Sequence, residues 1–252
     1  MEAPLAVFER FLKMDAPGTW NSDEARALVA GEFAKCAPSY STATPQEFDA
    51  IVRVDAEHAV ARVTVHDPGG RPLKSLKFDG VEPRTPALDF NRYFYLEKSD
   101  AWRVVSMRTL EQLGMRIMMV ALDDAIPEQD PALAGSVAHD RLTLESDPQL
   151  AQWFADHRSD LESLAARSLE LSKGKAAEFS EGSALDQALA ALHVDGTEVD
   201  SEHTVKIKIG GYGNDIVGLM RLAETATLPH ISPEDMIWAQ SLGGGWFLFR
   251  TT

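Results

Sequence analysis

Apolar positions recur at helical spacing in two short segments near the start of the chain. The first segment begins at Pro4, and the second follows Asn21, which can cap a helix together with Glu24. The spacing then changes to every second residue, which is the period of a strand with one buried face. We therefore expect two helices followed by five antiparallel strands, over 50–55, 59–65, a segment ending at 78, 89–97 and 101–109.

The middle of the chain changes from an apolar to a polar segment. Residues 110–122 are rich in Leu and Met and favour a helix. Apolar residues would cover nearly all faces of this helix, which is typical of a helix buried in a core or an interface. Residues 123–140 carry Pro127, Pro131, Gly135 and several acidic side chains, a composition typical of a linker. We therefore place a domain boundary in this second segment.

The remaining residues repeat the change from helical to strand spacing. Asp147 and Pro148 start a long helical pattern that ends near 173, and a shorter one follows Ser183. Strands are expected over 203–209, 215–222, 236–241 and 245–250. The sequence thus predicts an α+β protein of two domains with separate hydrophobic cores, divided as 1–122, a linker over 123–140, and 141–252.

The first domain has a characteristic order of elements: helix Val7–Leu12, the helix after Asn21, and the closing hairpin Arg92–Leu96 with Trp102–Val105. In this order it resembles the cone-shaped family of nuclear transport factor, SnoaL and ketosteroid isomerase. It implies a cone-shaped antiparallel sheet behind N-terminal helices. The isomerases of this family use a carboxylate base with tyrosine and protonated-acid donors. Phe8 and Phe11 stand where a tyrosine would be needed, so that catalytic set does not transfer to this chain.

The second domain is similar to a family of bacterial proteins with no assigned activity. The resemblance implies a shared fold of two helices and an antiparallel sheet, and it brings no mechanism. Its carriers are five short segments in order: Ile209–Gly211, Asn214–Gly218, Ile231–Pro233, Ile237–Trp238 and Gly245–Thr252.

Charge and composition restrict the possible partners. The 252 residues include 39 acidic and 24 basic side chains, giving a net charge of −15. Such a surface repels a phosphate backbone, so we expect no nucleic-acid partner. The negative charge either attracts a basic protein partner or simply keeps the protein soluble. The N-terminus has no signal-peptide pattern, and no apolar stretch reaches the roughly 20 residues that span a bilayer. We therefore expect a cytoplasmic protein without a membrane partner.

Metal and nucleophile patterns are weak in this sequence. Cys36 is the only cysteine, so a cysteine metal cluster is excluded, and we interpret Cys36 as a small buried side chain. No histidine pair has the spacing of a helical zinc site, and no Gly-x-Ser-x-Gly elbow occurs. The glycine-rich segment 210–213 precedes a strand and not a helix, which favours a turn over a phosphate loop. We expect no metal and no cofactor.

Seven residues remain as candidates for contact with a ligand or partner. Arg92 shares a strand face with apolar residues, so its charge must pair with an acid or bind an anion. His230, together with His203, can converge with Asp215 or Asp235. An aromatic face in the last hairpin is either core or a partner site. The candidates are Arg92, Tyr212, Asn214, Asp215, His230, Trp238 and Trp246.

These observations favour a non-enzymatic interaction protein, for example an immunity-type protein that captures a basic partner. One alternative is a small-molecule isomerase, dehydratase or hydrolase that uses the cone pocket, with Arg92 or a nearby acid as its polar group. Another is a small-ligand sensor around Tyr212, Asn214 and Asp215. An open cone interior would favour the enzyme, and a cone filled with Phe and Leu would argue against it.

Overall fold

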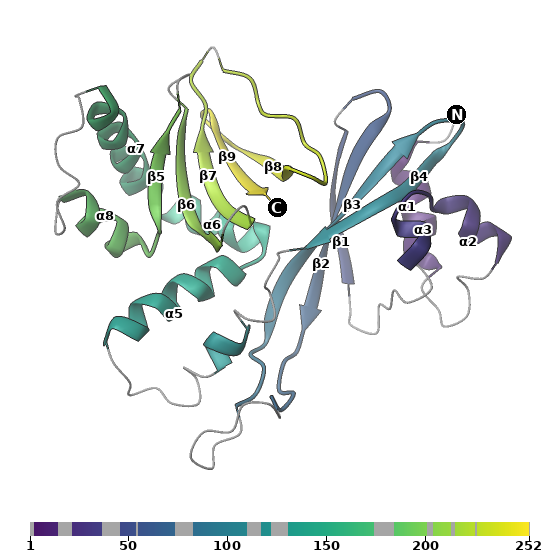
Figure 1. Cartoon of the computed structure of the whole chain (residues 1–252), viewed down its shortest axis with the longest axis horizontal. Coiled ribbons are helices and arrows are strands. Elements are labelled where there is room, and N and C mark those ends of the chain that lie inside the picture. The colour runs from purple at the N-terminus through teal and green to yellow at the C-terminus, as the bar shows by residue number, and fades with distance from the viewer. Residues whose placement is uncertain are drawn as a thin grey trace.

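The chain is a mixed α+β protein with two antiparallel sheets (Figure 1). The computed structural model describes residues 3–14, 22–36, 46–53, 55–73, 83–109, 117–121, 131–173, 184–200, 204–212, 215–224 and 226–251. No helix within these ranges is both long and apolar enough to cross a lipid bilayer.

The first sheet has the strand order β1-β2-β3-β4 and is preceded by three short helices. Pro4 lies in the first turn of the first helix, and Ser22, rather than Asn21, caps the second by accepting a hydrogen bond from the Ala25 amide. The expected strand ending at 78 lies largely outside the described residues. The elements are α1 (Pro4–Lys13), α2 (Asp23–Leu28), α3 (Phe33–Cys36), β1 (Gln46–Arg53), β2 (His58–Asp67), β3 (Leu88–Lys98) and β4 (Trp102–Thr109).

Aromatic rings fill the space between α1–α3 and the first sheet. Phe11 is buried, and its ring centroid lies 5.3 to 5.5 Å from those of Phe8, Phe33 and Phe94. Such edge-to-face and stacked contacts add to the free energy gained by burying the rings. The interior in which the cone-pocket hypothesis requires a cavity is therefore occupied by side chains.

The second sheet has the strand order β5-β6-β7-β9-β8. Residues 131–140, predicted as part of a linker, belong to a helix instead, because a proline is tolerated in the first turn. The predicted long helix is divided at His157. The elements are α5 (Pro131–Leu144), α6 (Asp147–Asp156), α7 (Arg158–Lys173), α8 (Ala184–Leu192), β5 (Gly196–Val199), β6 (Val205–Tyr212), β7 (Asp215–Arg221), β8 (Met236–Gly243) and β9 (Trp246–Thr251).

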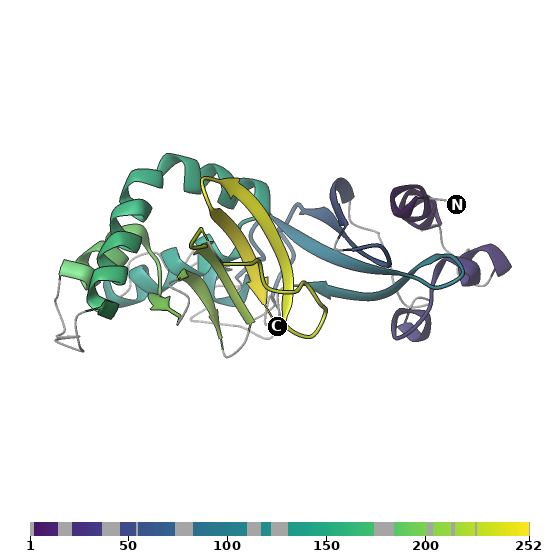
Figure 2. The ribbon, with the colours of Figure 1, turned by 90° about the horizontal axis from the view of Figure 1, so that it is seen from above.

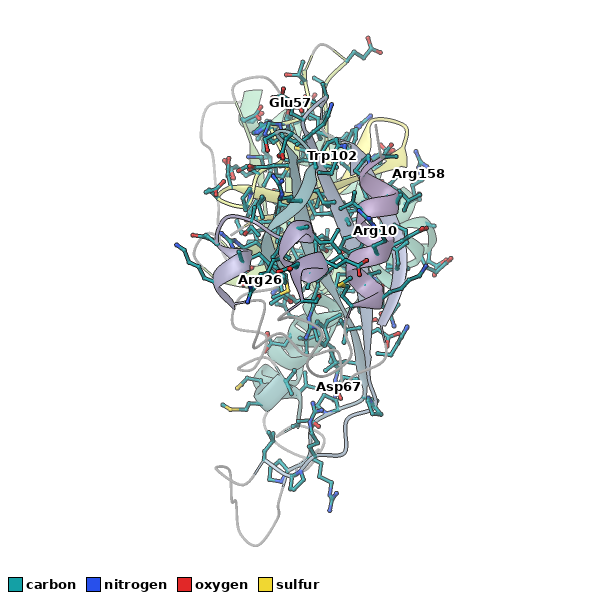
Figure 3. The ribbon with its side chains drawn as sticks, turned by 90° about the vertical axis from the view of Figure 1, so that its right-hand side faces the viewer. Arg10, Arg26, Glu57, Asp67, Trp102 and Arg158 are labelled. Atoms are coloured by element: carbon teal, nitrogen blue, oxygen red, sulfur yellow. The ribbon has the colours of Figure 1, made fainter. Side chains whose placement is uncertain are left out.

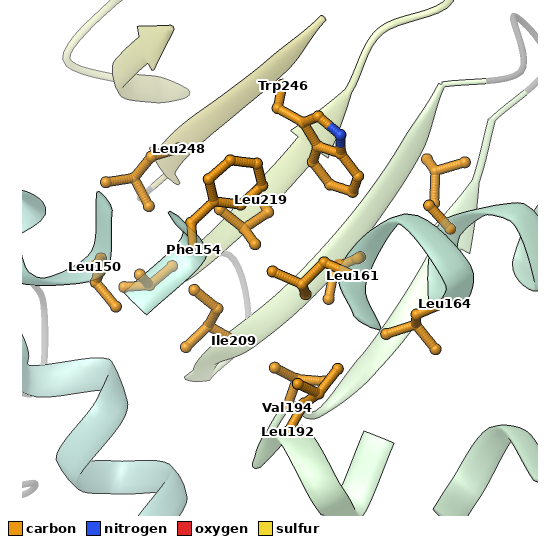
Figure 4. Packing of buried hydrophobic residues seen from close by; sticks show 14 of the residues in the cluster. Leu150, Phe154, Leu161, Leu164, Leu192, Val194, Ile209, Leu219, Trp246 and Leu248 are labelled. Atoms are coloured by element: carbon orange, nitrogen blue, oxygen red, sulfur yellow. The ribbon is translucent and has the colours of Figure 1, made fainter. Parts of the chain in front are cut away.

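A second core lies between these helices and one face of the second sheet (Figure 4). Phe154 and Leu161 from α6 and α7 pack against strand residues such as Leu219, Trp246 and Leu248. Alternate residues of β6, β7 and β9 supply this face, as the period of a strand requires.

A third cluster joins the two sheets. Val60, Tyr93 and Tyr95 of the first sheet pack with side chains from β7, β8 and β9, including Trp238 and Phe249. The expectation of two separate cores is therefore incomplete, because these residues form a core that both sheets share. The N-terminal helices lie on the far side of the first sheet from this contact, as both Figure 1 and Figure 2 show.

Candidate functional site

A row of polar side chains runs along one face of β2 and β3. The register of the two strands places these residues opposite each other in pairs. The pairs lie on the same face because alternate residues of a strand share a face. We call this set the polar row, and it consists of His66 with Asp89, Thr64 with Asn91, and Arg62 with Tyr93.

The buried end of the polar row contacts Asp147, the first residue of α6. Asp147 is completely buried, and its carboxylate accepts hydrogen bonds from Arg62 (3.1 Å), Arg250 (2.8 Å) and the Tyr93 hydroxyl (2.9 Å). Burial raises the pKa of the Tyr93 hydroxyl well above its ordinary value, so Tyr93 remains a donor. We call Arg62, Asp147 and Arg250 the charge cluster.

The charge cluster connects three parts of the chain that are distant in sequence. Arg62 also donates to the Gln240 side chain on β8 and lies over the Trp238 ring at 5.2 Å. Arg250 donates to the main-chain oxygen of Glu145 at 2.9 Å. Each guanidinium thus contacts both Asp147 and a second element. This arrangement is structural, because a buried charge is tolerated only when it is paired and hydrogen-bonded.

The middle of the polar row attaches α6 to β3. The Asn91 side chain donates to Thr64 and accepts a hydrogen bond of 2.6 Å from the Asp147 amide. Ser146 and Gln149 form a capping box at the same helix end. Both contacts fix the position of the Asp147 carboxylate relative to the first sheet.

The exposed end of the polar row opens into a groove between the first sheet and α5–α6. Two adjoining hollows of about 150 and 460 Å³ form this groove, and both are lined by Leu88, Asp89 and Gln149. His66 contributes to the larger hollow and Glu145 to the smaller one. Figure 3 shows Asp67, the next residue after His66, at the end of the first sheet opposite Glu57 and Trp102.

Two acids and a histidine meet in this groove. His66 Nδ1 lies 2.9 Å from Asp89 Oδ1. Burial, and in second place the charge of Asp89, raises the pKa of the Glu145 carboxyl. A histidine–carboxylate pair beside a carboxyl with a raised pKa can donate hydrogen bonds to a polar ligand and accept them from it.

The described side chains that line the two hollows are donors, acceptors and apolar groups, with no serine, threonine or cysteine among them. Within the described ranges, no three histidine, cysteine or acidic side chains are arranged to hold a metal ion. The groups present can bind a polar ligand.

The raised pKa of Glu145 predicts a pH-dependent effect of the variant Glu145→Gln. The pKa of Glu145 is higher in the folded state than in the unfolded state. Protonated Glu145 therefore contributes to stability below the ordinary pKa of a glutamate, and this contribution is lost as the pH rises through the raised pKa of the folded state. Glutamine resembles the protonated form. We expect the variant to gain stability relative to the parent chain as the pH rises, measured by urea unfolding at several pH values.

The control is the same substitution at Glu97, an exposed residue of β3. The stability difference from the parent should change with pH less steeply for Glu97→Gln than for Glu145→Gln. Equally steep changes would contradict this interpretation.

The structure describes only some of the predicted site residues, and it places those at separate positions. Arg92 is half-buried with its guanidinium 5.6 Å from the Phe90 ring, and His230 is exposed. Asn214 and the side chain of Tyr212 lie outside the described residues, as does His203. The convergence of His203 and His230 with an acid thus stays a prediction.

Three of the predicted site residues are buried. Asp215 is 2% exposed and acts electrostatically on Arg250 of the charge cluster, while Trp238 lies under Arg62. Trp246 belongs to the second core, where its indole N–H donates to Glu162 at 2.8 Å. The aromatic residues of the last hairpin are therefore core residues in both cases.

Sequence reasoning missed the charge cluster and the groove. A signal was present, because Arg62 interrupts a run of apolar strand residues and Arg250 follows Trp246–Phe249. A cation in such a position needs a buried acid as partner. Asp147 was interpreted only as a helix cap.

Comparison of the chain with models of protein families, with curated proteins and with solved structures gives no match. The interpretation of the site therefore depends on its own geometry.

Proposed function

We propose that this chain is a non-enzymatic interaction protein that binds a basic protein partner. The observation that carries the proposal is the uneven distribution of charge along the sequence. Residues 123–252 contain 22 acidic and 9 basic side chains, a net charge of −13, whereas residues 1–122 contain 17 acidic and 15 basic ones, a net charge of −2. The excess of negative charge thus belongs almost entirely to the part of the chain that forms the second sheet and its helices.

An uneven charge of this size acts on the rate of association. Complementary fields steer a basic protein towards the acidic side and raise the association rate by roughly 10- to 1000-fold at low salt. An immunity-type role in the cytoplasm, the capture of a basic toxin, is one function that uses such steering. In this proposal the first half of the chain, with its likeness to the cone-shaped family, is a scaffold and not a catalytic domain.

Two further features support binding over catalysis. The rings of Phe8, Phe11, Phe33 and Phe94 occupy the interior where a cone-fold enzyme would hold its substrate. The buried ionisable groups of the charge cluster pair with one another and thereby connect β2 and β9 to the start of α6. Neither group of residues is available to a substrate.

The test compares two variants of the full chain that each lose four exposed acids. The first carries Asp160→Asn, Glu198→Gln, Glu224→Gln and Asp235→Asn, and the matched control carries Glu9→Gln, Glu24→Gln, Glu57→Gln and Glu97→Gln, all at exposed positions. Affinity capture from the native cytoplasm, followed by mass spectrometry, identifies partners of the parent chain. Association rates with the purified partner are then measured for all three proteins at low and moderate salt.

We expect a basic partner whose association rate falls about tenfold with the first variant at low salt and much less with the control. Equal losses in both variants would mean that net charge alone, and not the acidic half, directs binding. The absence of any basic partner at both salt concentrations would contradict the proposal.

A further inference from the structure

The second sheet has a hollow on the face opposite its helices. Strand residues of one parity, such as Ile207 and Leu219, face the helical core. The alternate residues of β6, β7 and β9, together with the edge strand β5, line a hollow of about 270 Å³. This volume approaches the lower end of the range found for small-molecule sites.

The floor of the hollow is apolar. It is formed by Phe249, which is 3% exposed, and by Ile216 on the neighbouring strand. Gly218 is the reason why the phenyl ring can lie close to the sheet, because a Cβ at this position would come within 2.8 Å of the Phe249 ring. Ile216 is only half-buried, so the floor offers exposed apolar surface to the apolar body of a ligand.

Two lysines line the hollow beside these apolar residues. Lys206 and Lys208 are alternate residues of β6, so both extend from the same face of the sheet. Lys208 Nζ lies 3.2 Å from Asp195 Oδ2, and His139 Nε2 lies 3.2 Å from the other oxygen of Asp195. Asp195 thus links Lys208 to His139 of α5.

Lys206 differs from Lys208 in its contacts. No carboxylate in the described part of the chain forms an ion pair with its amine, although Glu198 is its cross-strand neighbour. An ammonium group beside an apolar floor, in a protein whose surface is otherwise acidic, is a local site for an anion. A lysine acts on such an anion as a point charge with three donors.

From this geometry we propose that the hollow binds a small amphipathic monocarboxylate. The carboxylate is bound by Lys206, with Lys208 beside it, and the apolar body lies on Ile216 and Phe249. The same acidic surface that repels polyanions restricts this site to ligands with one negative charge and a sizeable apolar part. This proposal does not depend on the partner-binding proposal above, although Glu198, one of the four acids changed in that test, also lines the hollow.

The test uses octanoate as the probe, together with octanamide and octylamine, which have the same chain but a neutral and a positive head group. Binding to the full-length protein is measured by isothermal titration calorimetry at low salt. Backbone amide shifts of the ¹⁵N-labelled protein then locate the ligand. The variants are Lys206→Ala and, as the matched control, Lys35→Ala, which removes an exposed lysine from α3.

We expect octanoate to bind with a dissociation constant on the order of 0.1 mM, and octanamide and octylamine at least about tenfold more weakly. Lys206→Ala should weaken octanoate binding by about five- to tenfold with an unchanged melting temperature, and Lys35→Ala should not weaken it. Amide shifts should concentrate in β5, β6 and the end of β9.

Three outcomes would overturn the proposal. Equal binding of octanamide would show that the lysines do not recognise the head group. Preferential binding of octylamine would assign the hollow to a cation held by Glu198. The absence of octanoate binding up to several millimolar, or amide shifts confined to other elements, would show that this hollow is not the site.

Discussion

Replacing Asp147 with alanine is expected to destabilise the protein by about 3–5 kcal/mol, the typical cost of removing one partner from a buried ion pair. Asp147 is the acceptor for two guanidiniums that are 5% and 3% exposed, so the variant leaves both positive charges buried without it. Urea or guanidinium unfolding monitored by circular dichroism measures this loss directly.

The matched control is Asp156→Ala. Asp156 is the last residue of the same helix, is exposed, and accepts a hydrogen bond from the exposed Gln152. We expect its loss to change the stability by about 0.5 kcal/mol or less. If Asp147→Ala cost no more than this control, the charge cluster would not be a stabilising connection between the sheets.

Replacing Phe11 with alanine is expected to cost about 3–5 kcal/mol as well, for a different reason. Phe11 is 1% exposed and its ring touches those of Phe8, Phe33 and Phe94. The variant removes apolar contacts and leaves a cavity, because neighbouring rings fixed by packing can fill it only in part. Thermal and denaturant unfolding measure the loss.

The control for this variant is Leu5→Ala on the same helix, since Leu5 is 38% exposed and its truncation leaves no cavity. An added test uses benzene, which fills apolar cavities of this kind. Benzene should raise the melting temperature of Phe11→Ala and not that of the parent. A loss below about 1 kcal/mol would reveal an interior that is already open, and would restore the hypothesis of a cone pocket.

The elements that the sequence predicted well are those whose hydrophobic spacing is regular. Val7, Phe8 and Phe11 mark the buried face of α1, and the alternation over 59–65 corresponds to β2. Local side-chain patterns determine such elements, so they can be read without knowledge of the rest of the fold.

The elements that were missed depend on contacts that a local pattern does not contain. The edge strand β5 has only four residues, Gly196–Val199, and no apolar alternation. The break between α6 and α7 arises at His157, whose ring nitrogen lies 2.8 Å from the main-chain oxygen of Trp153. Pro131 and Gly135 were interpreted as linker residues, although a proline is compatible with a helix start.

The candidate site was even less predictable than the fold. Asp147 lies 85 residues from Arg62 and 103 from Arg250, so no spacing rule connects them. The groove depends on the meeting of the end of β2 with α5 and α6, which only the packing of the two sheets brings about. Asp215 and Trp238 were predicted as ligand or partner contacts, and the structure places both in the interior, at 2% and 1% exposed.

The position of Asp147 has a consequence for how the chain can be divided. Cleavage in the segment 122–130 would yield an N-terminal fragment that retains Arg62 and Tyr93, and a C-terminal fragment that retains Asp147 and Arg250. The first fragment would lose the carboxylate that pairs with Arg62, and both fragments would expose to water the apolar side chains of the third cluster. Separation of either piece as an autonomous module is thus penalised by lost apolar burial, and the intact polypeptide should melt as a single cooperative unit.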